Sequence, residues 1–486
     1  MSTSPRRSGR TADRARPALA LIVVVAVVLG GVVDAVVGRA LPARAEAVGT
    51  AVVGDPAAGA SSSFCAGGTA GAGQPADPVV YLTNTGAKPV RGAMRTVAPP
   101  LAAAPGAHAT TLTVPARSTV AVDPTAGVPA GPVAASFVFD GGGVVASQVV
   151  RGPGGWAAAP CATRPAESLV FAGGSTAGGS SLTLSLLDPT AAPAVVDVTF
   201  LTPSGAVVPA PYQGIDLAPG QLVSEDVGTY VQNAGSVATL VTTESGSVVA
   251  DELEQWAGGA GLSLWLGARG ARTSWSFADT SATPGGALAV TVANPGAAAT
   301  TATVSFELGQ ASLVPRRVVV PGRALVTLDL TSTSGLPTST PFGVVVTARA
   351  PVVVARTVTA PSAAAPPRTG AWPGVGAPAR QWLVPGPAPV GAPPLAGVAP
   401  SDLAIADPGR APVDVTVVSL ATGKTVGRLV VAGDGVGIVT GATLAAAGPV
   451  VVRASAPVTV EAQAVPAGAP GVVVVTAVPY LELPSS

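Results

Sequence analysis

The chain has 486 residues, with 26 basic and 26 acidic side chains, 48% apolar residues, 60 glycines and 49 prolines. Because five of the arginines precede Ala18, the rest of the chain is weakly acidic and lacks the basic stripe of a nucleic-acid-binding surface. The apolar content argues against intrinsic disorder, and short valine and alanine runs between glycines and prolines predict β-strands with almost no helix beyond the N-terminal segment.

The N-terminal 63 residues are predicted to direct the protein out of the cytoplasm. Residues 1–17 form an arginine-rich cytoplasmic arm, and residues 18–38 form an apolar segment just long enough to cross about 30 Å of hydrocarbon. We favour an uncleaved single-pass membrane anchor. The alternative is a signal peptide cleaved at an Ala-x-Ala site, residues 43–45 or 45–47, which would give a secreted protein. Residues 39–63 are a linker, and everything beyond them is expected to be extracellular.

Four later segments share one plan. In each, an apolar run ends in an Asn or Asp turn, and an apolar residue of an alternating strand follows ten positions after the turn. A period of about 100 residues is that of a β-sandwich, which buries its own core, rather than that of a solenoid unit. The turns are Asn84-Thr85-Gly86, Asp188-Pro189-Thr190, Asn294-Pro295-Gly296 and Asp407-Pro408-Gly409.

The repeats predict an all-β fold of tandem immunoglobulin-like β-sandwich domains after one N-terminal hydrophobic helix. Each repeat is expected to close with a hairpin, whose tips are residues 140–143, 244–247, 349–351 and 454–457. The Pro- and Ala-rich residues 361–379 indicate a semi-rigid linker, after which the last domain is expected to move independently. The predicted sandwiches are residues 64–162, 168–269, 274–360 and 380–483.

Cys65 and Cys161 are the two cysteines, at the entrance to the first repeat and just past its end. In an exported protein we expect them to form a disulfide, which would stabilise the first domain by up to about 4–5 kcal/mol in the chain-entropy model. The alternative is a pair of free thiols for redox chemistry or metal binding. That alternative lacks a CxxC spacing or a nearby histidine.

Five tryptophans gather at the edges of the repeats, and Trp372 falls in the predicted linker. An exposed row of indoles would stack on sugar rings, whereas buried indoles would fill the joints between successive domains. We favour the joints and keep glycan binding as the alternative. The five edge tryptophans are Trp156, Trp256, Trp265, Trp275 and Trp382.

Side chains that could perform catalysis are scarce. His108, the only histidine, lies in an Ala/Gly/Pro loop that would hold a general base poorly. Asp251, Glu252 and Glu254 form the densest acidic cluster, and on a strand the two glutamates share a face about 7 Å apart, as in a glycosidase pair or a calcium site. We favour a solvated edge strand that resists aggregation. No catalytic, cofactor-binding or metal-binding residue is assigned, and no cofactor is expected.

The chain resembles the exported actinobacterial proteins of the family of unknown function DUF5719. The resemblance rests on the Arg-rich start with one hydrophobic segment, on the entrance at Cys65, and on repeat starts such as SLVFAGGSTAGG and SWSFADTSATPGG that lead into LLDPT and VANPG. It implies an envelope location and supplies no catalytic residues.

Three hypotheses for function follow. The first is a non-enzymatic, membrane-anchored envelope protein whose four domains form a rod that presents a surface to a protein partner or the cell wall. The second is a cell-wall glycan-binding protein that uses the edge tryptophans. The third is a carboxylate-dependent hydrolase centred on Asp251, Glu252 and Glu254.

Overall fold

The computed structural model describes residues 51–71, 76–99, 109–280, 285–309, 311–338, 340–361, 368–385, 398–444, 447–466 and 473–480. The predicted arm and apolar segment, together with His108, lie outside these residues. From Gly49 to Ser486 the chain forms one compact unit. In the described part, no helix combines the length and apolar character needed to cross a membrane.

The all-β prediction is confirmed, and the first repeat shows the plan that the others follow. Its strands form two antiparallel four-stranded sheets, and the short strands β2 (Thr69–Ala70) and β7 (Gly131–Pro132) form a separate pair. The two sheets share one apolar core that includes both cysteines. In sheet order the strands are β1 (Ser61–Cys65), β8 (Ala134–Phe139), β4 (Val90–Val97) and β5 (Ala109–Val114), then β10 (Gly155–Pro160), β9 (Val144–Gly152), β3 (Asp77–Asn84) and β6 (Ser118–Val122).

The second repeat also has two antiparallel sheets, one of five strands and one of four, with three 3-10 turns in its connections. These turns are η2 (Ala210–Tyr212), η3 (Val227–Thr229) and η4 (Ala257–Gly259). In sheet order its strands are β11 (Ser168–Phe171), β17 (Ala238–Ser245), β13 (Ala194–Thr202) with β14 (Gly205–Val207) and β15 (Ile215–Leu217), then β16 (Leu222–Asp226), β12 (Ser181–Leu187), β18 (Val249–Trp256) and β19 (Gly261–Leu266).

In the third and fourth repeats one long strand joins the two sheets. The third repeat consists of β20 (Arg272–Phe277), β21 (Ala287–Asn294), β22 (Thr300–Glu307), β23 (Arg316–Val320), β24 (Ala324–Asp329), β25 (Gly343–Ala360) and β26 (Arg368–Pro373). The fourth consists of β27 (Ala379–Val384), β28 (Val398–Asp407), β29 (Val413–Ser419), β30 (Thr425–Val431), β31 (Gly435–Val439), α2 (Gly441–Leu444), β32 (Val450–Pro466), β33 (Val473–Thr476) and β34 (Val478–Pro479).

The closing hairpins predicted at residues 140–143, 244–247, 349–351 and 454–457 are wrong. In the first repeat β8 pairs with β1 and β4, whereas β9 pairs with β3 and β10 in the other sheet. In the third and fourth repeats the same segment is a single strand, β25 or β32, that pairs in both sheets. An immunoglobulin sandwich keeps its sixth and seventh strands together in one sheet, so the strand order departs from the immunoglobulin-like order expected.

The turns that define the repeats are confirmed. The side-chain oxygen of the Asn or Asp accepts a hydrogen bond from the backbone N–H two residues later, at 2.8 Å for Asn84, Asp188 and Asp407 and 3.0 Å for Asn294. All four side chains are buried. The residues ten positions after these turns are also buried, as predicted: Met94, Val198, Val304 and Val417.

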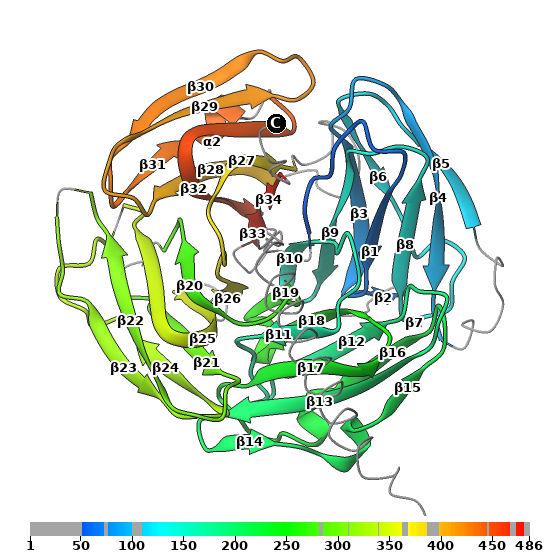
Figure 1. Cartoon of the computed structure of the whole chain (residues 1–486), viewed down its shortest axis with the longest axis horizontal. Coiled ribbons are helices and arrows are strands. Elements are labelled where there is room, and N and C mark those ends of the chain that lie inside the picture. The colour runs from blue at the N-terminus through cyan, green and yellow to red at the C-terminus, as the bar shows by residue number, and fades with distance from the viewer. Residues whose placement is uncertain are drawn as a thin grey trace, which may run out of the picture. The chain divides into compact units, whose positions relative to one another are not determined.

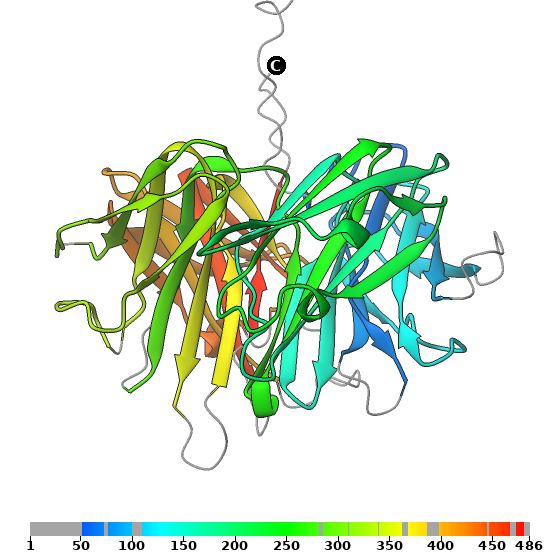
Figure 2. The ribbon, with the colours of Figure 1, turned by 90° about the horizontal axis from the view of Figure 1, so that it is seen from below.

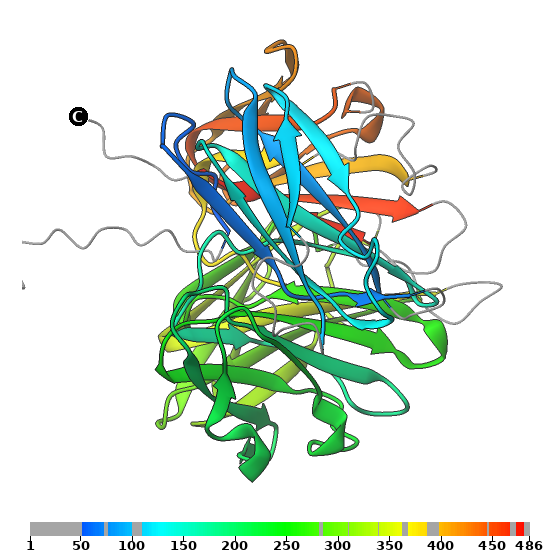
Figure 3. The same cartoon turned by 90° about the vertical axis from the view of Figure 1, so that its right-hand side faces the viewer.

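One sheet of each repeat packs against a sheet of the next. Phe64 and Val97 of the first repeat contact Leu187 and Leu222 of the second, and Figure 3 shows these two repeats side by side in blue to cyan and green. The second and third repeats meet through an apolar cluster of Leu201, Ala238, Ala293 and Leu325, in the region where green meets yellow-green in Figure 2. The third and fourth meet through a cluster of Ala278, Ala404 and Ala406.

The fourth repeat packs in turn against the first, which closes the series. Val145 of the first repeat lies in one apolar cluster with Leu383 and Val451 of the fourth. Val53, which precedes the first repeat, forms a parallel bridge with Tyr480, which follows the fourth. The innermost strands β10, β19, β26 and β33 lie near the centre of this circle (Figure 1).

The closed circle corrects two expectations. A rod would leave its first and last domains apart, yet these two repeats share an apolar core. The linker predicted at residues 361–379 is also wrong where it is described, because β26 pairs with β25 as the last strand of the third repeat. Its proline- and alanine-rich composition suggested an extended linker, but Trp372 within it packs into the core.

Candidate functional site

Asp251 makes the central polar contact between the first two repeats. Its side chain on β18 is fully buried, and Oδ2 accepts hydrogen bonds from the backbone N–H groups of Ala66 and Gly67, at 2.8 Å each, and from Nε2 of Gln148 at 2.6 Å. A side chain larger than hydrogen at Gly67 would collide with Leu264 and crowd Asp251. Because hydrogen bonds to a charged acceptor are stronger than neutral ones, Asp251 ties the second repeat to the first.

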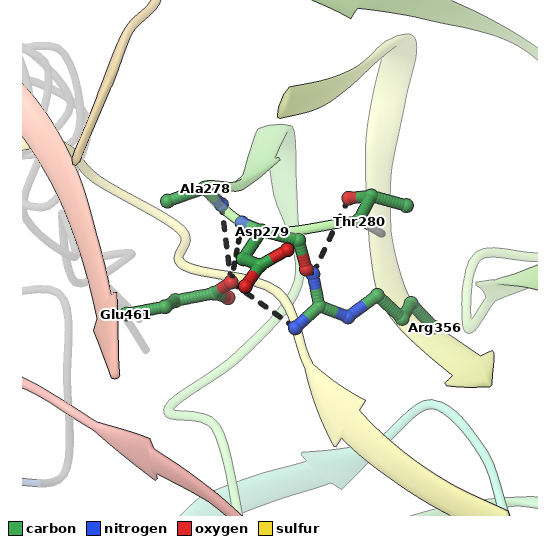
Figure 4. Close-up of polar contacts among 5 residues, drawn as sticks. All are labelled: Ala278, Asp279, Thr280, Arg356 and Glu461. Atoms are coloured by element: carbon green, nitrogen blue, oxygen red, sulfur yellow. Dashed lines mark hydrogen bonds and ion pairs between the residues drawn. The ribbon is translucent and has the colours of Figure 1, made fainter. Parts of the chain in front are cut away.

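Glu461 makes the corresponding contact between the third and fourth repeats (Figure 4). Its Oε2 accepts hydrogen bonds from the backbone N–H groups of Ala278 at 3.1 Å and Asp279 at 2.9 Å, and it pairs with Nη2 of Arg356 at 3.1 Å. Arg356 also donates to the carbonyl oxygen of Asp279 and, at 3.3 Å, to the hydroxyl of Thr280. The ion pair is thus surrounded by additional hydrogen bonds.

Two aromatic rings complete the Arg356 site. The guanidinium carbon lies 5.2 Å from the ring centre of Phe277 and 5.3 Å from that of Trp372. Such cation–π contacts favour a desolvated arginine, whose charge Glu461 balances. Arg356 is completely buried.

Asp251 and Glu461 occupy the same position in their repeats. Each pairs across its sheet with the residue three places before the Asp turn of that repeat. Ser147 and Ala355 hold this position in the first and third repeats. Carboxylate-centred joints therefore join the first repeat to the second and the third to the fourth, whereas the other two joints lack a carboxylate at this position.

Burial raises the pKa of both joint carboxylates. The pKa of Asp251 rises to about 6, with the hydrogen bonds from Gln148, Ala66 and Gly67 opposing the effect of burial. Burial also raises the pKa of Glu461, which the positive charge of Arg356 opposes. The Asp251 carboxyl is stabilised by donors of the neighbouring repeat rather than by water.

Glu252 and Glu254 are not the solvated edge residues that we expected. β18 lies inside its sheet between β12 and β19, and both glutamates are fully buried. Burial raises the pKa of Glu252 to about 8 and that of Glu254 well above its ordinary value, where the charge of Glu252 adds to the effect. The acidic composition suggested an exposed edge, whereas strand order places these residues on a central strand.

The edge tryptophans divide into two groups. Trp265, Trp275 and Trp382 are buried, as is Trp372, whereas Trp156 and Trp256 are partly exposed. Trp265 belongs to a cluster that includes residues of both the second and the third repeats, so it fits the joint interpretation.

Trp275, which belongs to the same cluster as Trp265, and Trp382 make their hydrogen bonds within their own repeats. The indole N–H of Trp275 donates to the carbonyl oxygen of Val352 at 2.7 Å, and that of Trp382 donates to Val458 at 3.0 Å. Of the partly exposed pair, Trp156 has the guanidinium carbon of Arg151 5.6 Å from its ring centre. The indole of Trp256 donates to Ser263 at 3.3 Å.

The predicted disulfide between Cys65 and Cys161 is confirmed. It links the end of β1 to the residue after β10 and so connects the two sheets of the first repeat. Within the described residues, no group of three or more His, Cys, Asp or Glu side chains is arranged to hold a metal ion.

Sequence reasoning did not identify Gln148, Arg356, Glu461 or Glu307, a buried acid at the end of β22. The available signal was a single polar or charged residue within an apolar strand, as in VVVARTV and VTVEAQAV. A buried charge needs a partner, so such a residue points to a contact with another element.

A model of the family of unknown function DUF5719 matches residues 141–428. No curated protein matches the chain. The crystal structure of Thermotoga maritima 1070 is 16% identical over 22% of this chain and 94% of its own, with a TM-score of 0.20. A tetra-tandem repeat from the extending region of a large adhesion protein is 14% identical over 82% of this chain and 93% of its own, with a TM-score of 0.11. At these TM-scores neither likeness bears on fold or function.

Proposed function

The chain belongs to family DUF5719, and we propose that it is a non-enzymatic, membrane-anchored envelope protein that binds a protein partner outside the cytoplasm. The arginine-rich start and the apolar residues 18–38 support the anchored, extracytoplasmic location. The ring of repeats supplies a rigid platform, because apolar contacts join every repeat to the next.

The observation that carries this proposal is a pair of exposed edge strands. β23 and β30 each pair on one side only, with β22 and β29. They occupy equivalent places in the third and fourth repeats, and Val319 and Val430 at matching positions are 64% and 66% exposed. Exposed β-branched residues on an unpaired edge favour addition of a strand from another chain.

Each edge also carries an arginine two residues before the exposed valine. Arg317 and Arg428 are exposed and share a strand face with Val319 and Val430, because side chains two residues apart point the same way. A complementary partner strand would alternate acidic and apolar residues on one face. The two edges thus present the same recognition pattern twice.

In-cell crosslinking followed by mass spectrometry tests this proposal. We expect the full-length chain to capture a protein partner, and the double variant Val319→Lys, Val430→Lys to lose it. Val314→Lys is the matched control, since Val314 is 87% exposed but lies outside the strands. Equal capture by the double variant and the control would contradict partner binding at these edges.

A second candidate is binding of cell-wall glycan through Trp156 and Trp256. Both indoles are partly exposed, and an exposed indole can stack on a sugar ring. Capture of wall fragments that depends on both indoles, and not on Val319 and Val430, would favour it. The hydrolase hypothesis is not carried forward, because its three carboxylates are fully buried.

A further inference from the structure

The disulfide of the first repeat lies directly beside the groups that hold Asp251. Cys65 is followed in the chain by Ala66 and Gly67. The backbone N–H groups of these two residues donate to the Asp251 carboxylate. Both cysteines are buried, with exposed fractions of 2% for Cys65 and 0% for Cys161. The bridge therefore fixes the chain at the residue before the two backbone donors.

The other half of the bridge is tied to both sheets of the first repeat. The backbone N–H of Cys161 donates to the carbonyl oxygen of Ala146 on β9, at 2.9 Å. The next residue, Ala162, exchanges two backbone hydrogen bonds with Phe64 of β1, at 2.7 and 2.9 Å. β9 also carries Gln148, the third donor of the joint. The disulfide thus braces the end of β1 against the strand that supplies the side-chain donor.

The first three repeats have a matching pair of positions here. An isolated antiparallel bridge marks the place in each, Phe64 with Ala162, Val170 with Ala268 and Ser276 with Val375. The residue after the first partner and the residue before the second are Cys65 and Cys161, Phe171 and Gly267, or Phe277 and Gly374. In the second and third repeats the phenylalanine ring packs over the glycine, where an added Cβ would lie 2.9 or 3.0 Å from a ring carbon. In the first repeat the disulfide takes the place of this contact.

The third repeat shows what a contact at this position supports. Phe277 is followed by Ala278 and Asp279, whose backbone N–H groups donate to Glu461 of the fourth repeat. Both carboxylate-centred joints therefore take their two backbone donors from the residues directly after this contact. In the joint to the fourth repeat the contact is a packed ring, whereas in the joint to the second repeat it is a covalent bond that reduction can break.

We propose that the disulfide between Cys65 and Cys161 is a redox switch for the joint between the first and second repeats. When the bridge forms, the two thiols lose two protons and two electrons, and these reduce one external disulfide to two thiols. The bridge then holds the two backbone donors in place for Asp251, whereas reduction releases them. Exchange requires direct attack on sulfur, and both cysteines are buried, so oxidation precedes closure of the joint.

A double-mutant cycle in the full-length chain tests this coupling. A cross-link that acts only on the unfolded chain would add its effect to that of Asp251→Asn, whereas a brace for the joint would not. We expect Asp251→Asn to lower the free energy of unfolding of the native chain, and to lower that of the Cys65→Ala, Cys161→Ala chain by less than half as much. Equal losses in the two backgrounds would overturn the proposal.

The rate of reduction gives a second readout that keeps both cysteines. Coupling is reciprocal, so a weakened joint should expose the bridge, and dithiothreitol without urea should reduce Asp251→Asn about tenfold faster than the native chain. Alkylation and mass spectrometry follow the released thiols. Val304→Ala is the control, since it destabilises the core of the third repeat without touching the joint. Equal acceleration by the two variants, or none by Asp251→Asn, would contradict the switch.

No partner protein takes part in either measurement. Loss of the switch hypothesis would therefore leave the proposed binding at β23 and β30 intact, and the reverse also holds.

Discussion

Asp251 and Glu252 are adjacent on β18, yet their carboxylates have different surroundings. Asp251 points to the first repeat and accepts hydrogen bonds from three donors, whereas Glu252 points into the core of its own repeat, because neighbouring strand residues face opposite ways. The Asp251 carboxylate joins two repeats, whereas the Glu252 carboxyl is buried within one repeat at a cost in stability. Substitutions at the two positions should therefore have different effects on stability.

Asp251→Asn should lower the free energy of unfolding by about 1–3 kcal/mol, because the neutral amide accepts these hydrogen bonds more weakly and brings donors of its own. Urea unfolding measures this change. Asp216→Asn, at an exposed residue of the same repeat, is the control and should change stability little. Equal stability of the two variants would show that Asp251 is not the anchor of this joint.

Glu252 should make stability fall with rising pH. Its pKa is raised to about 8 in the folded state, so between about pH 4.5 and 8 the folded chain keeps a proton that the unfolded chain has lost. The contribution of this group is complete below that window and is lost at up to about 1.4 kcal/mol per pH unit through it. Urea titrations from pH 5 to 8 should show a flatter profile for Glu252→Gln, and Glu244→Gln should leave the slope unchanged.

At the scale of elements, the sequence predicted the strands better than their pairing. The turns at Asn84 and Asp407 and the alternation after them depend on neighbouring residues, which local patterns record. The passage of β25 and β32 from one sheet to the other depends on which distant strand each half meets. Apolar runs around a polar bend look the same in both cases, so a hairpin was expected where the structure has a crossing strand.

Local sequence patterns also did not show which charged residues are buried. Glu252 and Arg356 each stand in a sequence that also fits an exposed edge, and only strand order shows that β18 and β25 are central. The Cys65–Cys161 bridge was predictable, because with two cysteines an intrachain disulfide has one possible pairing. The joints formed by Asp251 and Glu461 were not, since their donors lie in other repeats.

The assignment of β26 as a strand rather than a linker leads to a further prediction. Trp372 is 6% exposed and packs against the Arg356 guanidinium, so Trp372→Ala should cost about 3–5 kcal/mol. Thermal or urea unfolding should show this loss, and a smaller one for Trp156→Ala, because Trp156 is only partly buried. If Trp372→Ala left the stability unchanged, the linker interpretation would be favoured again.

At the scale of the whole molecule, the sequence did not indicate that the four repeats close into a ring. The period of about 100 residues and the four turns define the repeats, but a row and a ring of such repeats have the same internal patterns. Closure depends on residues that are far apart in the chain, such as Val145 with Leu383 and Val451. Those residues are ordinary core valines and leucines in the sequence.

Ring closure also determines how the two proposed binding edges, β23 and β30, are held. In a ring, β23 and β30 are held by repeats that both have neighbours on each side, so their edges keep a fixed relation within the compact unit. A partner that engaged both edges would gain affinity from the high effective concentration of the second site.

The most direct test of ring closure is an engineered disulfide between Val53→Cys and Tyr480→Cys in the full-length chain, which are bridge partners before the first repeat and after the fourth. After mild oxidation and digestion, mass spectrometry should find these two positions linked within one chain, beside the native Cys65–Cys161 bond. Val53→Cys with Val314→Cys, an exposed position on the third repeat, should not link. Absence of the Val53–Tyr480 link, or equal linkage in the control pair, would contradict the closed ring and favour a row of repeats.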